Sequence, residues 1–255
     1  MNRREFCSVL SATSLSLIHA NNVVEENGFV AKLYQDARGR QLPYQLFEPR
    51  AYDRRQAYPL VLWLHGGAGR GNDNQKQIMG GNSVGSRVWT RPENQKRNPC
   101  FVVAPQCPDD QVWASAQGRA QPSQPLLLAL ELLSELGKTF HLDMRRLYVT
   151  GQSLGGFGTW GAILYRPDMF AASIPVCGGG DEAQAAKLRA MPVWAFHGET
   201  DQSVPVERSR RMIEALRQAG GAPRYTEYKG AGHVIWERVF HEPELAPWVF
   251  AQNRG

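Results

Sequence analysis

Long hydrophobic runs are missing from this sequence of 255 residues. The longest nearly apolar stretch extends from Leu126 to Leu133 and is interrupted by Glu131, whereas a membrane-spanning helix needs roughly 20 apolar residues. Basic clusters are missing too, because the 29 lysines and arginines are scattered among 24 acidic residues. A formal net charge of +5 without a basic patch gives no footprint for nucleic acid. The sequence therefore predicts neither a membrane span nor a nucleic-acid partner.

Cysteine is also scarce, with four residues in the whole chain. Cys7 lies in a leader-like N-terminal segment, which leaves Cys100, Cys107 and Cys177, and an odd number gives no disulfide framework. Cys100 and Cys107 flank a predicted strand, and a rise of about 3.3 Å per residue places them roughly 20 Å apart, too far for a bridge. We expect all three to be buried apolar thiols without a catalytic role.

The first 20 residues have the pattern of a secretory signal peptide. Arg3 and Arg4 form a basic start, a weakly apolar stretch begins at Cys7, and Ala20 supplies a small residue at the end. The paired arginines resemble a twin-arginine leader, which directs export of a folded protein to the periplasm or beyond. We predict a signal peptide over residues 1–20 and a mature chain over 21–255. A frayed extension of a cytosolic enzyme is the alternative.

Strand-like and helix-like segments alternate from residue 59 to the end of the chain. This alternation predicts an α/β fold with a mostly parallel central sheet and helices on both faces. The first two strands have no helix between them and should form an antiparallel edge. The length suits a single domain. The predicted strands span 28–35, 42–47, 59–65, 100–105, 146–150, 170–177, 192–197 and 225–229, and the predicted helices 125–140, 153–165 and 207–219.

The segment Gly151-Gln152-Ser153-Leu154-Gly155 has the pattern G-x-S-x-G between a predicted strand and a predicted helix. In that context the pattern is typical of a nucleophile elbow, a tight turn that lifts a serine hydroxyl out of the backbone. The flanking glycines leave room for the turn. The sequence therefore predicts that Ser153 is a nucleophile.

A serine hydroxyl needs a base, and the base needs an orienting carboxylate. His233 follows the last predicted strand, and the preceding strand-to-helix loop offers Glu199 and Asp201. We favour Asp201, because Glu199 is nearer the strand end and should brace the loop. Ser153, Asp201 and His233 then follow the chain order nucleophile, acid, base of α/β-hydrolases.

The same chemistry needs two N–H donors for the oxyanion of the tetrahedral intermediate. Glycines at 66, 67 and 69 follow the buried strand 59–65 and let the backbone approach a substrate oxygen without a side chain between them. We predict the amides of Gly67 and Leu154 as the donors. Two further histidines, His65 and His197, end buried strands and are expected to shape loops.

With these motifs, residues 28–252 resemble the serine α/β-hydrolases. More narrowly, the chain is similar to exported feruloyl and acetylxylan esterases, polyhydroxybutyrate depolymerases and dienelactone-hydrolase-like proteins. The similarity rests on residues 64–74, 104–108 with Trp113, 151–158, and Gly232-His233 with Trp236. It implies hydrolysis of carboxylic esters through an acyl-serine, with neither a cofactor nor a metal. The oligomeric state stays open.

Two spacings bear on the substrate. Residues 178–191 are too few for a lid domain between two strands, which predicts an open site for a short-chain, aromatic or polymer-attached ester. We expect Gln152, Trp113 and Trp236 to contact it, the tryptophans by stacking on an aromatic or sugar ring. The alternatives are a serine peptidase, a dienelactone or thioester hydrolase, and a non-enzymatic binding module. A cysteine in place of Ser153 would favour the dienelactone chemistry, and an intact triad argues against the binding module.

Overall fold

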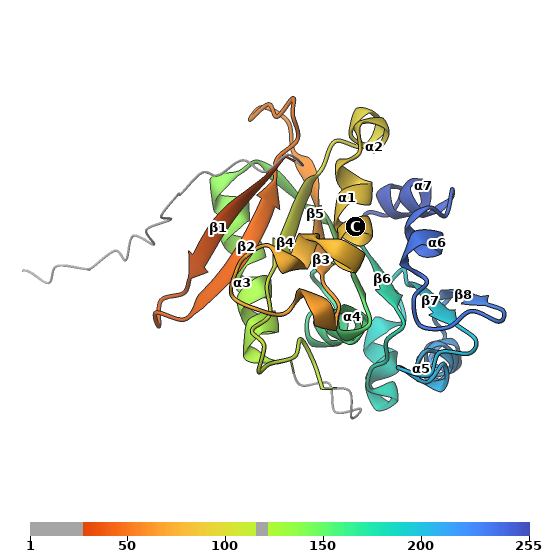
Figure 1. Ribbon diagram of the computed structural model, residues 1–255. Coiled ribbons are helices and arrows are strands. Elements are labelled where there is room, and N and C mark those ends of the chain that lie inside the picture. Colours follow the sequence, from red (N-terminus) through yellow and green to blue (C-terminus); the bar gives the residue numbers. More distant parts are fainter. Residues whose placement is uncertain (1–27, 116–121) are drawn as a thin grey trace, which may run out of the picture.

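The computed structural model describes residues 28–115 and 122–255, which form one eight-stranded sheet in the order β1-β2-β4-β3-β5-β6-β7-β8 (Figure 1). Strands β1 and β2 pair antiparallel, as do β2 and β4, and the remaining neighbours are parallel. The predicted mostly parallel sheet with an antiparallel edge is confirmed. The strands are Phe29–Gln35 (β1), Gln41–Phe47 (β2), Tyr58–Leu64 (β3), Phe101–Pro105 (β4), Leu142–Gln152 (β5), Ala172–Val176 (β6), Trp194–Gly198 (β7) and Arg224–Tyr228 (β8).

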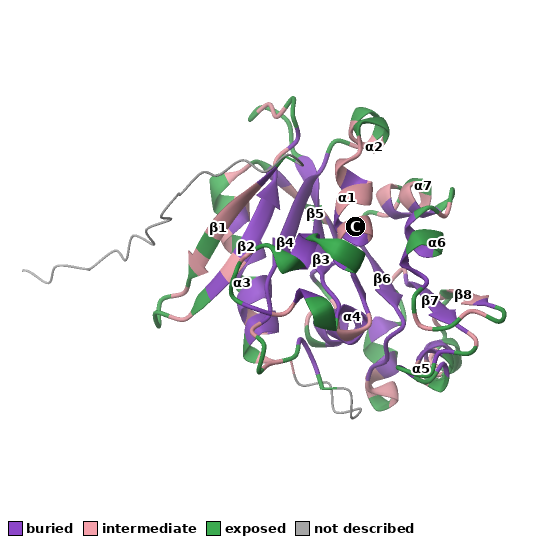
Figure 2. Cartoon of the chain, in the orientation of Figure 1, coloured by how far each residue is buried: buried purple, intermediate pink, exposed green. Residues whose placement is uncertain are grey.

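Helices cover both faces of this sheet, as predicted. One apolar cluster joins the sheet to α3, α4 and α5, and a second joins the opposite face to α6 and α7. The central strands are buried between these layers (Figure 2). The helices are Ser83–Arg87 (α1), Pro92–Arg97 (α2), Gln124–Thr139 (α3), Leu154–Tyr165 (α4), Glu207–Gln218 (α5), Trp236–Phe240 (α6) and Leu245–Phe250 (α7).

Strand β3 shows how the sequence produces this layering. All seven of its residues are buried, and alternate side chains point to opposite faces. Leu62 and Leu64 belong to the first cluster, and Val61 and Trp63 to the second. A continuous apolar run is therefore what a strand covered on both sides requires.

Two regions differ from the sequence prediction. Strand β5 begins at Leu142, four positions before the predicted start. The sequence does not indicate this extension, because apolar and polar residues alternate there and form no apolar run. The stretch between β3 and β4, where the sequence analysis predicts neither a helix nor a strand, contains α1, α2 and several short 3-10 turns. The first of these turns, η1, covers Gly67–Gly69.

The interval between β6 and β7 holds a loop and the 3-10 helix η5 at Glu182–Leu188, so no lid domain is inserted there. No helix in the part of the chain that the structure describes is long and apolar enough to cross a membrane. The predicted signal peptide lies outside the described residues.

Candidate active site

Ser153 lies at the sharp turn between β5 and α4, with φ of 54° and ψ of −114°. Positive φ is costly for a residue with a side chain and occurs where the surroundings enforce it. The surroundings here are tight, because a Cβ on Gly155 would stand 1.8 Å from the carbonyl oxygen of Leu64, and one on Gly151 would stand 2.5 Å from it. The turn therefore depends on both glycines of the motif and presents the serine as a nucleophile elbow does.

The structure brings Ser153, His233 and Asp201 together. Nε2 of His233 lies 2.9 Å from Oγ of Ser153, and Nδ1 lies 2.6 Å from Oδ2 of Asp201. An ionised carboxylate can only accept, so Nδ1 carries the proton of the neutral ring. Nε2 is then the acceptor for the serine hydroxyl. This arrangement can take a proton from Ser153 and hold the resulting imidazolium against a carboxylate.

Asp201 is held as a carboxylate by several donors. Its Oδ1 accepts the backbone N–H groups of Ser203 and Val204, each at 2.9 Å. Burial opposes the charge, but the hydrogen bonds from His233 and from these two N–H groups outweigh it and lower the pKa of Asp201. The carboxylate is therefore ionised at neutral pH, as an orienting acid must be.

Glu199, the other acid of this loop, has a different neighbour. Its Oε2 accepts the backbone N–H of Gly230 at 2.7 Å. Gly230 has a φ of 65° and lies in the turn that leads from β8 to His233. Glu199 therefore braces the loop that carries the histidine, as the sequence analysis expects, and it does not contact the imidazole in place of Asp201.

Gly67 and Leu154, the predicted oxyanion donors, both occupy the first position of a helical turn. Gly67 begins η1 and Leu154 begins α4, and the first N–H groups of a helix have no intrahelical partner. A Cβ placed on Gly67 would meet nothing within 4 Å, so this position borders open space. Gly66 contacts Gln152, with a Cβ position 3.4 Å from its Cγ. The glycine loop therefore lies against the elbow.

Trp113 does not have the predicted role. Its side chain is fully buried, and its indole N–H donates to the carbonyl of His65 at 3.2 Å. A Cβ on Gly158 would stand 2.6 Å from Cβ of Trp113, so the indole also packs against α4. The prediction that Trp113 stacks on substrate is wrong, because the ring is enclosed behind the oxyanion loop and supports it.

The side chain of Gln152 also contacts the protein backbone. Its Nε2 donates to the carbonyl of Gly81 at 2.9 Å, and its Oε1 is buried. We expected this amide to face the substrate, and the structure corrects that expectation. Asn82, which the sequence analysis missed, accepts the N–H of Gly66 at 2.9 Å. These contacts connect the elbow and the glycine loop to residues 81–82. No local sequence motif between β3 and β4 identifies Asn82.

Trp236 borders the site. Its ring meets that of His233 edge-on with centroids 5.1 Å apart, and its Nε1 is 3.8 Å from a Cβ built on Gly81. Its contact with substrate stays a prediction. Two exposed apolar side chains are close in the chain to Gly81 and His233. They are Met79 and Val234, which are 49% and 79% exposed.

Cys177 lies directly beneath the triad. The three described cysteines are free and buried, which confirms that part of the prediction. The Sγ of Cys177 donates to the carbonyl of His233 at 3.6 Å, and burial raises the pKa of its thiol. Cys177, Asp201 and His233 offer three possible ligand atoms within 4.8 Å of one another. A thiol kept neutral, beside a carboxylate and an imidazole bonded to each other, is a poor metal site.

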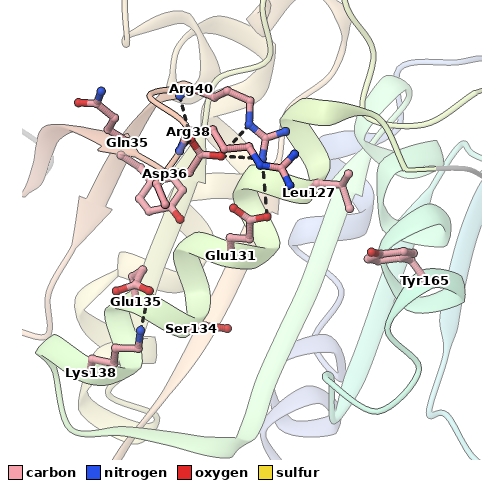
Figure 3. A pocket seen from close by; sticks show the side chains of 12 residues that line it. Gln35, Asp36, Arg38, Arg40, Leu127, Glu131, Ser134, Glu135, Lys138 and Tyr165 are labelled. Atoms are coloured by element: carbon pink, nitrogen blue, oxygen red, sulfur yellow. Dashed lines mark hydrogen bonds and ion pairs between the residues drawn. The ribbon is translucent and has the colours of Figure 1, made fainter. Parts of the chain in front are cut away.

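A cavity of about 630 Å³ lies away from the serine, between the β1–β2 hairpin and α3 (Figure 3). Its charges pair with each other: Arg40 contacts Asp36 at 2.6 Å, and Lys138 contacts Glu135 at 2.7 Å. Burial, followed by the charge of Glu131, raises the pKa of Tyr34 to about 12. None of its lining residues belongs to the triad, so we assign it no part in the chemistry.

Comparisons with known proteins agree with this fold. The dienelactone hydrolase family matches residues 117–240. A thermostable esterase of known structure superposes with a TM-score of 0.86 and 38% identity, over 89% of this chain and 64% of that one. A probable carboxylesterase (SOBER1-like) of Arabidopsis thaliana is 23% identical over 193 residues, or 70% of this chain and 74% of that protein.

A bifunctional acetylxylan esterase/xylanase of Neocallimastix patriciarum is 25% identical over 100 residues, which are 39% of this chain and 15% of that protein. The chain therefore corresponds to a small part of that relative. Fold and similarities together define the class of protein. The chain has the α/β-hydrolase fold and is similar to esterases and to the dienelactone hydrolase family. The resemblance stated from the sequence is thereby confirmed.

Proposed function

We propose that the protein is a serine carboxylesterase in which Ser153 is the nucleophile, His233 the general base and Asp201 the orienting acid. The observation that carries this proposal is the pair of contacts made by His233, 2.9 Å to the serine hydroxyl and 2.6 Å to the carboxylate. It is supported by the strained elbow at Ser153 and by two helical N-termini beside it.

The reaction proceeds in two halves. In the first, His233 takes the proton of Ser153 as Oγ attacks the ester carbonyl, and the N–H groups of Gly67 and Leu154 stabilise the oxyanion. The tetrahedral intermediate collapses, the bond to the alcohol oxygen breaks, and His233 returns the proton to the leaving alcohol. In the second half, His233 activates a water, which attacks the acyl-serine. The acid is released and the hydroxyl of Ser153 is restored.

The substrate we propose is an ester with a short or aromatic acyl group, free or attached to a polymer. Only a loop and η5 lie between β6 and β7, so a long acyl chain finds no lid there. The exposed side chains of Met79 and Val234 and the edge of Trp236 offer partial apolar contact instead. The acetylxylan esterase similarity is consistent with a small acyl group.

The proposal is tested by trapping the intermediate. Rapid mixing with p-nitrophenyl acetate should give a burst of nitrophenol followed by slower turnover when deacylation is rate-limiting. Peptide mass spectrometry of enzyme quenched during turnover should then show acetyl on the peptide that contains Ser153. Acetyl on another residue, or active enzyme that stays unmodified at Ser153 throughout a burst, contradicts the proposed mechanism.

A second candidate is hydrolysis of an unsaturated lactone, favoured by the match of residues 117–240 to the dienelactone hydrolase family. The same three residues would open the ring, and the leaving alkoxide would stay attached to the acyl group. A dienelactone should therefore be tested beside acetate, methyl ferulate and acetylated xylan. A kcat/KM for the lactone above those of all the open-chain esters would favour this second candidate.

We also propose that the protein is exported, from the Arg3-Arg4 leader pattern of residues 1–20. N-terminal sequencing of protein from the native host should find a start near Asn21. Intact Met1 on most of the protein would contradict export with cleavage.

A further inference from the structure

A second buried imidazole contacts the carboxylate of the triad. His197, in β7, is fully buried, and its Nε2 lies 3.3 Å from Oδ2 of Asp201 and 2.9 Å from the carbonyl oxygen of Val204. The same Oδ2 accepts from His233 at 2.6 Å. Two imidazoles therefore share one carboxylate oxygen, and His197 approaches it from the interior.

The proton positions on His197 follow from its partners. The carbonyl of Val204 can only accept, so Nε2 carries a proton and donates it to that carbonyl, with Oδ2 of Asp201 at 3.3 Å from the same nitrogen. Nδ1 lies 2.7 Å from Oγ of Ser209, a buried hydroxyl in α5 that is also 3.0 Å from the carbonyl of Gly178. In the neutral ring Nδ1 is an acceptor, so the Ser209 hydroxyl donates to it.

Charges around this group favour the neutral ring. Burial, the largest influence, lowers the pKa of His197, although the carbonyl of Val204 and the charge of Asp201 act in the opposite direction. His197 is thus neutral at neutral pH, and the positive end of its Nε2–H group, which donates to Val204, lies close to Oδ2 of Asp201. The titratable and charged groups that face it or its partners are Asp201, His233, Cys177 at the end of β6, Glu227 and Tyr225 on β8, and Arg210, which pairs with Glu227.

We propose that His197 is a positioning residue for the proposed ester hydrolysis, which fixes Oδ2 of Asp201 and withdraws part of its negative charge from His233. This inference rests on the proposed function. Ser209 completes the arrangement by donating to Nδ1 and so fixing the tautomer of His197, with its Oγ 3.0 Å from the carbonyl oxygen of Gly178. Gly178 in turn packs on the elbow helix, because a Cβ there would stand 2.4 Å from the carbonyl carbon of Gly156. The acid loop and the nucleophile turn are thereby held in one buried network.

Two consequences follow when the N–H donor of His197 is lost. The charge of Asp201 then acts more fully on His233 and favours its protonated form, so the acidic limb of kcat/KM moves to higher pH. The carboxylate is also less well fixed, so kcat falls, while KM changes little because His197 is remote from the cleft. A residue that only fills space would lower stability without moving the pH profile.

The test compares His197→Gln with His197→Asn. The amide nitrogen of glutamine reaches about as far as Nε2 of histidine, so it can still donate to Val204 and keep an N–H group close to Asp201. The amide nitrogen of asparagine reaches about as far as Nδ1 and can contact only Ser209. We expect His197→Asn to lower kcat about tenfold, part of what a general base contributes, with KM within about twofold. The acidic limb of its kcat/KM profile should move up by about half a pH unit. His197→Gln should recover most of the loss in kcat and most of the shift in the acidic limb.

Equal pH profiles for wild type, His197→Gln and His197→Asn would overturn the inference, even if both variants were less stable. Ser209→Ala removes the hydrogen-bond partner of Nδ1 of His197. It replaces His197→Asn in the test if that variant does not fold. It should shift the acidic limb in the same direction by a smaller amount, and an unmoved limb contradicts the inference. Failure of the proposed function has a different signature, since Ser153→Ala would then keep its activity whatever the His197 variants do.

Discussion

His65 accepts the backbone N–H of Cys107 through Nε2 at 3.0 Å, and this contact joins the end of β3 to the end of β4. Nδ1 lies 2.7 Å from the carbonyl of Gly66 and therefore carries the proton. Both nitrogens are thus used by the neutral ring. Burial lowers the pKa of His65 to about 4, although the Gly66 carbonyl opposes the shift. The loop that holds Gly67 consequently depends on an uncharged histidine.

We predict from this that acid destabilises the fold above the range where carboxylates protonate. The unfolded chain binds a proton at His65 near pH 6.5, whereas the folded chain does so only near pH 4. Stability from this group is therefore complete above about pH 6.5 and is lost as the pH falls toward 4. Between pH 7 and 5 the free energy of unfolding should fall by about 2 kcal/mol from His65 alone.

Urea unfolding at pH 7 and pH 5 measures this change. His65→Gln should be less stable at pH 7 and should show a smaller pH dependence, retaining the part contributed by His197, whose pKa is also lowered. An identical pH dependence in wild type and His65→Gln contradicts the assignment.

A second prediction concerns the oxyanion donor at Gly67. Gly66 has an extended backbone, with φ of −74° and ψ of 178°, which is compatible with a following proline, and proline is tolerated at the first helical position. Gly67→Pro should therefore fold but lack the N–H. We expect kcat to fall by about 100- to 1000-fold.

Gly67→Ala is the matched control for that variant. It keeps the N–H and adds a methyl group that meets nothing within 4 Å, so its kcat should stay within about threefold of wild type. Equal losses in both variants would show that the loop, and not the amide, matters.

The open cleft leads to a third prediction, on acyl-chain preference. A long alkyl chain should gain only part of the roughly 0.8 kcal/mol per methylene that full burial provides, because no lid domain is inserted between β6 and β7. Acetate and methyl ferulate should therefore have a higher kcat/KM than a decanoate ester. A decanoate ester that exceeds both would contradict the open-cleft argument. Met79→Ala, at a 49% exposed position, would then test whether the segment that precedes α1 supplies an apolar wall.

Much of this architecture could be predicted because local patterns determine it. The apolar run of β3 indicates a strand buried on both faces, and the glycines around Ser153 are required by contacts as short as 1.8 Å to a neighbouring backbone. Asp201 could be preferred over Glu199 from its place in the loop. The patterns that identify these features involve residues a few positions apart, although the close contact of Gly155 is itself made to Leu64 of β3.

Other features depend on contacts between distant segments, and the sequence does not reveal them. Trp113 and Gln152 were expected at the substrate, but Trp113 donates to His65 and Gln152 to Gly81, across 48 and 71 positions. An indole or a carboxamide can bind a ligand or a backbone carbonyl equally well. His197 was expected only to shape a loop. Its contact with Asp201 spans only four positions, but it depends on how the loop after β7 folds, which the sequence does not show.

The most direct test of the account is the ester turnover of Ser153→Ala. The hydroxyl removed is bonded to His233 at 2.9 Å, and its loss opens no cavity in the core. Ser134→Ala, at an exposed position of α3, is the control and should match wild type. We predict that purified Ser153→Ala keeps the thermal midpoint of wild type to within a few degrees and loses at least about 1000-fold in kcat/KM on p-nitrophenyl acetate. A well-folded Ser153→Ala that retains a tenth of the wild-type activity would contradict the assignment of Ser153 as the nucleophile.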